Sequence, residues 1–369
     1  MHGALGTLAA LLCATAQGQL VALPKYYEAK DLGAVSEYRP LGCIAPNGTV
    51  GLTRRLAEPP YGTNDRAVVY SPFGDFKLFY RFGMDSWAQG CNSRGEFVGQ
   101  GDVAQGVIWD VEWNSGPQIL PGTQKGPAEP LALNDKRQVV GRVVFNVDSN
   151  GTDYLATLWT TSQVPEDPQV SVTTLFAGEA VAINSVGQIA ATRVDWTTGK
   201  RAAVFVTNGG ASVTKLLPDN VGSSDAAGID EKGMVVGHAT DSSGKKVGFV
   251  WSPYTMGYTL LGPARVSTSP LTHSLPRAIS SLGMVIVGQS HNTTKAGSVT
   301  TPRATVWPQA GTARNLNDEA SMANGGALTF TLTDAIGVAA DGRVLCEGRT
   351  SDGKRRAVLL TPRPGGSWS

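Results

Sequence analysis

AINSVGQIAA at residues 182–191, GIDEKGMVVG at residues 228–237 and AISSLGMVIVG at residues 278–288 are three copies of one short cassette. Each copy has an Ile followed by a small polar residue, a turn that contains Gly, and a strand of small or β-branched residues. Some fifteen residues later a further strand ends in an aromatic residue, as at Trp251 and Trp307. β-Branched residues bounded by Asn, Asp and Gly are typical of strands joined by tight turns. The cassette therefore predicts an all-β fold.

Two independent markers give the number of copies. The residue that closes the last strand of each cassette recurs at gaps of 39 to 56 residues, and the glycine of the turn recurs with it, except that Arg137 replaces it in the third copy. The closing residues are Tyr70, Trp109, Trp159, Val206, Trp251, Trp307 and Leu360, and the turn glycines are Gly48, Gly95, Gly187, Gly233, Gly283 and Gly342. A period of this length with four short strands per unit indicates propeller blades. We expect a seven-bladed β-propeller with four-stranded antiparallel blades.

The two ends of the repeat are complementary. The last copy runs to Leu360 without a following Leu-rich strand, whereas residues 30–33 are a surplus copy of that strand before the first cassette. The sequence therefore predicts that an N-terminal strand completes the last blade and closes the ring, which removes exposed strand edges. An open solenoid is the alternative, but it requires capping repeats and leaves the complementary ends unexplained.

Composition excludes several classes of protein. The 369 residues are 41% hydrophobic and 17% charged, so the chain has enough apolar residues to bury a core. The 45 glycines and 21 prolines favour short strands and turns over long helices. A formal charge of +1 argues against a nucleic-acid partner or an anionic membrane surface.

The N-terminal residues 1–18 resemble a secretory signal peptide, with an apolar run over residues 4–14 and a small-residue site at residues 14–16. A buried first strand or helix is the alternative. No later segment has the ~18 apolar residues that a membrane span needs. We therefore expect a secreted or periplasmic protein, with the propeller as one domain over residues 19–363 and a flexible tail over residues 364–369.

The cassette resembles the HAF-type extracellular repeat family, found mainly in secreted bacterial proteins. The resemblance rests on the Ala-x-x-Ile-Asn-x-x-Gly-x-Val-Val-Gly pattern with its following aromatic strand, and covers Leu41 to Leu360. This chain departs from the His-Ala-Phe tripeptide of the family; the equivalent positions read Arg66-Ala67-Val68 and Arg303-Ala304-Thr305, for example. The resemblance implies an exported β-propeller-like protein and no established activity.

Removal of a signal peptide leaves three cysteines, Cys43, Cys91 and Cys346. An odd number permits at most one internal disulfide. Cys43 and Cys91 occupy nearly equivalent points of consecutive repeats, so they either face each other across two blades or are small core residues.

Any function must lie in residues that do not repeat. The hairpins between the Val-Val-Gly strand and the aromatic strand are the long, irregular ones, so we expect the binding face there. An exposed indole beside a carboxylate at Asp195-Trp196 suits stacking on a sugar ring, or else Trp196 packs on its own hairpin. The other candidate ligand-binding residues are Asp102, His238, His273 and His291, the histidines being placed in loops of neighbouring blades.

Signatures of catalysis and of cofactors are missing from the sequence. The three histidines lack a metal-ligand spacing, and residues 148–153 look like a calcium loop without its closing Glu; we expect no metal and no cofactor. No GxSxG, HExxH or phosphate-binding loop is present. We expect a monomeric secreted binding or scaffold module for an extracellular glycan or protein. An extracellular polysaccharide hydrolase or lyase, acting at the channel mouth, is the alternative.

Overall fold

The structure, a computed structural model, describes residues 26–57, 63–70, 76–78, 85–101, 105–110, 117–122, 126–148, 151–162, 169–267, 269–308, 312–322 and 325–364. Helix is limited in this part to the 3-10 turn Asn208–Gly210 and the short helix α1 (Leu316–Glu319). None of the helices in these ranges is long and apolar enough to cross a membrane. The signal peptide predicted at residues 1–18 lies outside the described residues, as do residues 365–369 of the predicted tail.

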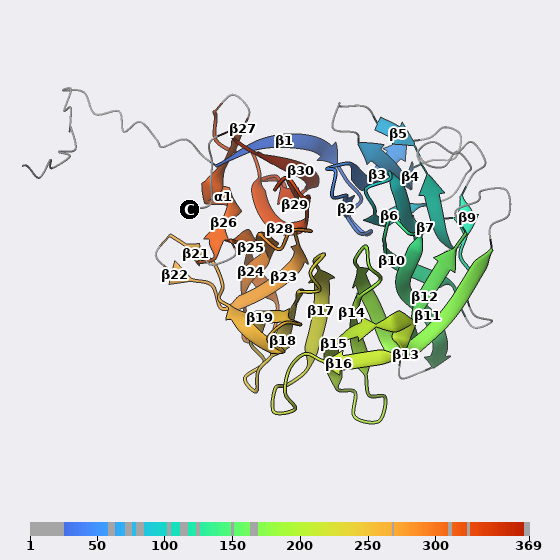
Figure 1. Cartoon of the computed structure of the whole chain (residues 1–369). Helices are drawn as coiled ribbons and strands as arrows, with labels where there is room; N and C mark the ends of the chain where they lie inside the picture. Colours follow the sequence, from blue (N-terminus) through green and yellow to red (C-terminus); the bar gives the residue numbers. More distant parts are fainter. Residues whose placement is uncertain are drawn as a thin grey trace, which may run out of the picture.

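The strands form antiparallel sheets that follow one another along the chain and radiate from a common centre (Figure 1). Four of the sheets are four-stranded, with the strands in chain order. They contain β2 (Gly42–Ile44), β3 (Val50–Ala57), β4 (Thr63–Tyr70) and β5 (Phe76–Leu78); β6 (Trp87–Cys91), β7 (Glu96–Gln100), β8 (Gly106–Asp110) and β9 (Gln118–Ile119); β17 (Ser224–Ile229), β18 (Val235–Thr240), β19 (Lys246–Ser252) and β20 (Gly257–Leu261); and β23 (His273–Ile279), β24 (Val285–Thr293), β25 (Val299–Pro308) and β26 (Arg314–Asn315).

A seven-stranded sheet joins two of the sequence repeats through one long strand. The N-terminal part of that strand, β13, pairs with the preceding strand, and its C-terminal part, from Gly178 onward, pairs with the next one. Gly178 has φ +134°, and a Cβ there would lie 2.0 Å from the Thr192 carbonyl oxygen, so only glycine fits where the two pairings meet. The strands are β10 (Ala128–Leu133), β11 (Gln138–Asp148), β12 (Gly151–Thr161), β13 (Val170–Ile183), β14 (Ile189–Val194), β15 (Arg201–Thr207) and β16 (Ser212–Lys215).

The last sheet combines strands from both ends of the described chain, in the order β27 (Ala320–Met322), β1 (Tyr27–Ala34), β30 (Arg355–Pro362), β29 (Val344–Arg349) and β28 (Thr331–Val338). β1 runs antiparallel to β30, with Asp31 opposite Val358, and Arg356 donates to the Asp31 carboxylate at 2.6 Å. β27 adds to the other edge of β1 in parallel. A small two-stranded sheet, β21 (Arg265–Val266) and β22 (Ser269–Pro270), completes the described strands.

The turn after each innermost strand keeps the conformation that the repeat predicts. Arg137, which stands where the other copies have Gly, has φ +58°, as the Gly position of this turn requires. In the same turn the side chain of Asn134 accepts hydrogen bonds from the backbone N–H groups of Lys136 and Gln138, each at 3.0 Å. The Asn of the cassette is therefore a turn former, as expected from the sequence.

The same asparagines also join neighbouring sheets. The amide of Asn92 donates to the Asn134 carbonyl, that of Asn134 to the Asn184 carbonyl, and that of Asn184 to the Asp230 carbonyl, at 2.9 to 3.1 Å. We call Asn92, Asn134, Asn184 and Asp230 the amide belt, and the face that it borders the turn face. This second role of the Asn was not predicted from the sequence.

The core lies between consecutive sheets. The recurrent tryptophans, predicted as packing residues, are at most 2% exposed; they are Trp109, Trp159, Trp251 and Trp307. The indole N–H of Trp159 donates to the Pro121 carbonyl at 3.0 Å. These side chains are structural, and the prediction of their role is confirmed.

Candidate functional site

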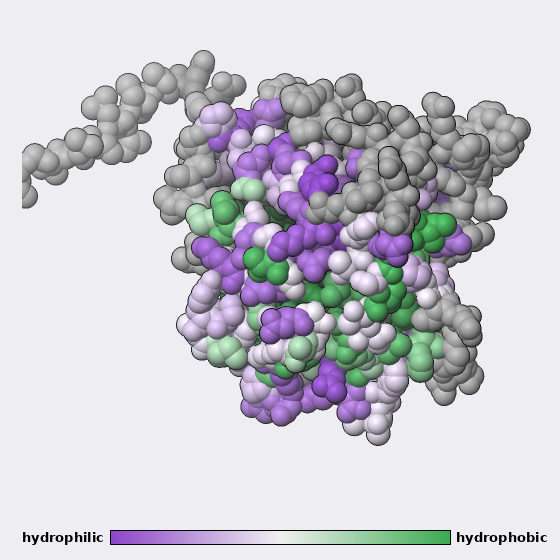
Figure 2. Space-filling view, turned by 45° about the vertical axis from the view of Figure 1, so that its right-hand side comes forward, coloured by the Kyte–Doolittle hydropathy of each residue, from purple (hydrophilic) through white to green (hydrophobic). Residues whose placement is uncertain are grey.

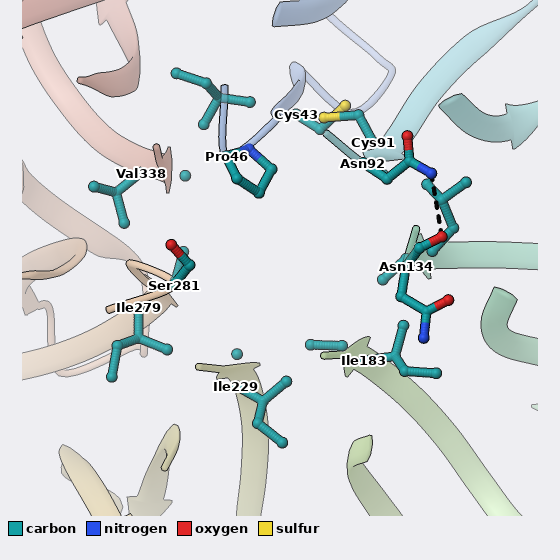
Figure 3. A pocket seen from close by; sticks show the side chains of 18 of the residues that line it. Cys43, Pro46, Cys91, Asn92, Asn134, Ile183, Ile229, Ile279, Ser281 and Val338 are labelled. Carbon is teal, nitrogen blue, oxygen red and sulfur yellow. Dashed lines mark hydrogen bonds between the residues drawn. The ribbon is translucent and has the colours of Figure 1, made fainter. Parts of the chain in front are cut away.

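A cavity of about 310 Å³ occupies the centre of the molecule, where the innermost strands meet. Figure 3 shows Ile183, Ile229, Ile279 and Val338 around this space, each from a different strand. In the space-filling view, hydrophobic residues gather in and beside the hollow near the middle of the visible face (Figure 2). The Ile of the cassette thus lines the central channel, as the sequence predicts.

Bulges in the innermost strands add further residues to the wall of this cavity. The register of pairing shifts between Ala88 and Gly90, between Pro130 and Ala132, between Ala226 and Gly228, and between Pro276 and Ala278. The residue left over at each shift lines the cavity; these residues are Gln89, Leu131, Ala227 and Arg277. A bulge re-aims a side chain out of the ladder, so this position changes the channel chemistry without changing the fold.

Arg277 is the cation among the described residues that line the cavity. Its guanidinium contacts one carboxylate oxygen of Asp334 in β28. Nε lies 3.2 Å and Nη2 lies 3.1 Å from Asp334 Oδ2. Burial raises the pKa of Asp334, and Arg277 opposes this shift. The pair joins β23 to β28 across the seam between two sheets.

The acidic residues of the cavity are held by serines of the preceding sheet. Asp135 accepts from the backbone N–H of Ser93 at 3.0 Å and from its hydroxyl. Glu231 accepts from the backbone N–H of Ser185 at 3.2 Å and from its hydroxyl. Both carboxylates therefore serve as acceptors between sheets at the rim of the turn face.

The opposite face, which carries the hairpins between second and third strands, has a row of alternating charges. Arg142 contacts Glu129 at 2.7 Å and Glu179 at 2.8 Å, and Arg201 contacts Glu179 at 2.6 Å and Asp225 at 2.5 Å. We call these five residues the ion belt and this side the hairpin face. The belt crosses from β10 to β17 and therefore joins consecutive sheets, as the amide belt does on the turn face.

An aromatic cluster lies beside the ion belt. Phe145 of β11 and Trp196, which follows β14, stack with ring centroids 5.5 Å apart and an interplanar angle of 10°. Both remain open to solvent, with exposed fractions of 40% and 47%. The Arg142 guanidinium lies over the Tyr154 ring at 4.1 Å, and Arg142, Tyr154 and Trp196 share a pocket of about 190 Å³. We call Phe145, Tyr154 and Trp196 the aromatic cluster.

The two neighbours predicted to act together, Asp195 and Trp196, have separate roles. Asp195 accepts from the backbone N–H groups of Thr197 and Thr198 at 2.9 and 3.3 Å, and these bonds lower its pKa. Trp196 packs on Phe145 from another hairpin, not on its own. One oxygen of the carboxylate, Oδ1, is therefore used within the turn, while Asp195 and Trp196 together line a further pocket of about 530 Å³.

The three candidate histidines lie in strands, not in loops as expected. His273 and His291 occur in β23 and β24 directly opposite each other, because these strands continue beyond the predicted hairpin boundary. Their rings stack with centroids 4.8 Å apart. His238 lies in β18 and contacts Asp225 at 3.5 Å. The structure therefore brings two of the three together.

All three imidazoles are shifted toward the neutral form. Burial lowers the pKa of His238 to about 4, aided by Lys246, Arg277 and Arg201 and opposed by Asp225. Burial, His273, Lys246 and Arg277 likewise lower the pKa of His291 to about 4. Burial, together with Lys245 and Lys246, lowers the pKa of His273.

The remaining candidates give little chemistry. Asp102 lies outside the described residues, as do residues 149 and 150 of the segment that looks like a calcium loop. Within the described ranges no group of three or more His, Cys, Asp or Glu side chains is placed to hold a metal ion. Sequence reasoning missed Arg142, Phe145, Tyr154 and Arg277. The available signal for the first three was the long run of strand-forming residues over 138–161, which forms two strands of 11 residues each.

Comparison with known proteins identifies the fold of the chain. No protein-family model and no curated protein matches the chain. The β-propeller domain of the trilobed protease from Pyrococcus furiosus, described as having an open velcro topology, is 10% identical with a TM-score of 0.53, over 93% of this chain and 97% of that one. YCF48 bound to D1 peptide is 9% identical with a TM-score of 0.52, over 93% and 100%. The Dos1 propeller is 11% identical with a TM-score of 0.51, over 91% and 95%. At these identities the likeness establishes an all-β propeller fold and nothing about a ligand.

Proposed function

We propose that this propeller is a binding module whose ligand is a polypeptide, held on the hairpin face by the aromatic cluster and the adjacent ion belt. The observation that carries the proposal is the half-exposed stack of Phe145 on Trp196 beside the Arg142–Tyr154 pair. Aromatic residues and Arg supply most of the binding energy in protein interfaces. A charged rim around an apolar centre is the usual organisation of such an interface.

The contacts favour a polypeptide over the glycan that the sequence equally allowed. A sugar ring stacked on Trp196 needs polar groups nearby with free hydrogen-bonding capacity. Asp195 already accepts two hydrogen bonds of its own turn through Oδ1, and Glu179 bridges two arginines. The cluster therefore offers aromatic area and fixed charges, which suit a partner with apolar and charged side chains. The peptide bound to YCF48 is a precedent for the fold.

We further propose that the sheets are seven blades and that β1 closes the ring by completing the last one. The pairing of β1 with β30 and the ion pair of Arg356 with Asp31 support this proposal. We retain the HAF-type repeat, export and a monomeric state as parts of the same proposal. A chain shortened to start after residue 34 should lose the β30 edge partner, and a lower unfolding temperature in such a chain would test closure.

Selection of peptides from a random phage-displayed library on the immobilised full chain tests the function. We expect peptides that bind the parent and lose at least about tenfold in affinity for the Trp196→Ala variant, since an aromatic anchor contributes ~2 kcal/mol or more. Tyr254→Ala, at an aromatic residue that is 75% exposed on another hairpin, is the matched control and should bind normally.

A glycan array on the same two variants separates the rival functions. Glycan binding that depends on Trp196, without selected peptides, would overturn the polypeptide proposal in favour of a carbohydrate ligand. Release of oligosaccharides from an extracellular polysaccharide would favour the hydrolase or lyase instead. Peptides that bind parent and Trp196→Ala equally would move the site away from the aromatic cluster.

A further inference from the structure

Cys43 and Cys91 lie on the innermost strands of the first two blades, β2 and β6, and both line the central cavity. Figure 3 shows their side chains side by side. Both belong to one packed cluster. Burial, together with the neighbouring Cys43 thiol, raises the pKa of Cys91. The two thiols therefore lie next to each other across the seam between the blades.

The repeat register explains why they meet. Cys91 pairs with Phe97 in the second blade, and the equivalent pair in the first blade is Ile44 with Val50. Cys91 is therefore equivalent to Ile44, and Cys43 lies one residue before that position. Successive side chains of a strand point to opposite faces, so Cys43 points to the second blade and Cys91 points back to the first. Both belong to the cluster between these blades, which includes Ala67 and Trp109.

The local packing leaves room for a sulfur at this seam. Gly51, opposite Cys43, has no side chain, and a Cβ there would lie 3.1 Å from Cys43 Sγ. Cys91 is partly exposed, and the cavity gives access to it. Cys346, by contrast, lies in β29 with no exposed surface, in the core of the last blade. Among the described residues it is the one cysteine that does not line the cavity.

We propose that Cys43 and Cys91 are an oxidation site at which a disulfide-bearing oxidant, small molecule or oxidoreductase, forms a disulfide between the first two blades. One cysteine, as its thiolate, attacks a sulfur of the oxidant RSSR and releases RS⁻, which takes up a proton. The second thiol loses its proton, attacks the mixed disulfide and expels the other RS⁻. Two protein thiols are thereby oxidised to one disulfide, and one RSSR is reduced to two RSH. The bond links two strands of the channel wall and closes the chain between residues 43 and 91.

Oxidised glutathione, added under native conditions to the reduced full chain with Cys13→Ser, is the test. We expect intact mass spectrometry to show the loss of two hydrogen atoms, and mapping without reductant to recover one cross-link between Cys43 and Cys91, with Cys346 free. Because the pKa of Cys91 is raised, the reaction should accelerate with rising pH. In Cys43→Ser and Cys91→Ser the remaining cysteine should instead gain one glutathione.

A second measurement does not depend on variants that fold. Phenylarsine oxide, which bridges two neighbouring thiols, should protect Cys43 and Cys91 of the reduced parent from iodoacetamide. The oxidised parent should melt several degrees higher than the reduced one. The proposal is overturned if the cross-link forms only in urea, if Cys346 takes part in it, if the arsenical protects neither thiol, or if oxidation lowers the melting temperature.

Discussion

The amide belt on the turn face and the ion belt on the hairpin face both join one blade to the next, but with different residues. The amide belt uses the same repeat position each time, and its members are at most 4% exposed. The ion belt uses charged side chains that are partly exposed, such as Arg201 and Glu179. The buried contacts of the turn face therefore recur at one repeat position, and those of the hairpin face are charges next to the aromatic cluster. The difference indicates that the turn face depends on residues that repeat, whereas the contacts of the hairpin face use residues that do not repeat.

Asn184→Ala tests whether the amide belt is structural, and we expect the largest effect there. The side chain accepts from Gln188 N, donates to Gln188 Oε1 and donates to the Asp230 carbonyl, at 2.8 to 3.0 Å. Loss of three buried hydrogen bonds should lower the unfolding free energy by about 4 kcal/mol in urea titrations. Val186→Ala, two residues on and 62% exposed, should change it by less than about 0.5 kcal/mol. A cost of Asn184→Ala near that of the control would refute the belt.

Acid should weaken the hairpin face and leave the amide belt intact. Because the pKa of His291 is lowered to about 4 in the folded chain, its stabilising effect is complete above the ordinary pKa of ~6.5 and is lost as the pH falls toward 4. We expect this histidine to account for up to about 3 kcal/mol of lost stability across that window. In His291→Phe, which keeps a ring against His273, the pH dependence of urea unfolding should be shallower, with a residual slope from His238. An unchanged slope would show that His291 does not titrate in this way.

Glu179→Gln tests the ion belt directly. The change removes the charge that Arg142 and Arg201 share, and leaves both guanidinium groups half-paired. We expect a loss of about 2 kcal/mol at low salt, intermediate between an exposed and a buried ion pair, and a smaller loss in molar salt because partly exposed charges are screened. Asp352→Asn, which removes one partner of the exposed pair with Lys354, should have no measurable effect. A loss that does not change with salt would mean that Glu179 acts through packing.

The predictability of the two faces from sequence differs for a physical reason. The repeat predicts the strands, the turn conformation and even the positive φ of Arg137, because each copy must satisfy the same local geometry. It predicts the Asn as a turn former but not its bond to the next blade, since that contact depends on how consecutive sheets pack. The stack of Phe145 on Trp196 joins hairpins some fifty residues apart in the chain, and nothing local encodes it. The sequence places His273 and His291 in loops because the repeat pattern ends before them, and it does not show that the pairing of β23 with β24 continues to these residues.

Asp230 is the member of the amide belt that is not an asparagine, and we expect the smallest change in stability from substituting it. Its Oδ1 accepts from Lys232 and Met234, as the asparagines do, but Oδ2 is buried without a hydrogen-bond partner among the described residues. Burial raises the pKa of Asp230, so the charged form destabilises the fold at neutral pH. Asp230→Asn supplies an amide that can donate to the next blade, as the asparagines of the belt do, and should stabilise the chain by about 1 kcal/mol at pH 7. The gain should shrink in acid as the wild-type carboxyl becomes protonated.

Asp241→Asn is the matched control with the opposite sign, because hydrogen bonds from Ser243 and Lys245 lower the pKa of that exposed carboxylate. If both substitutions destabilise the chain, Asp230 is not a defect in the belt and its carboxylate has a partner of its own.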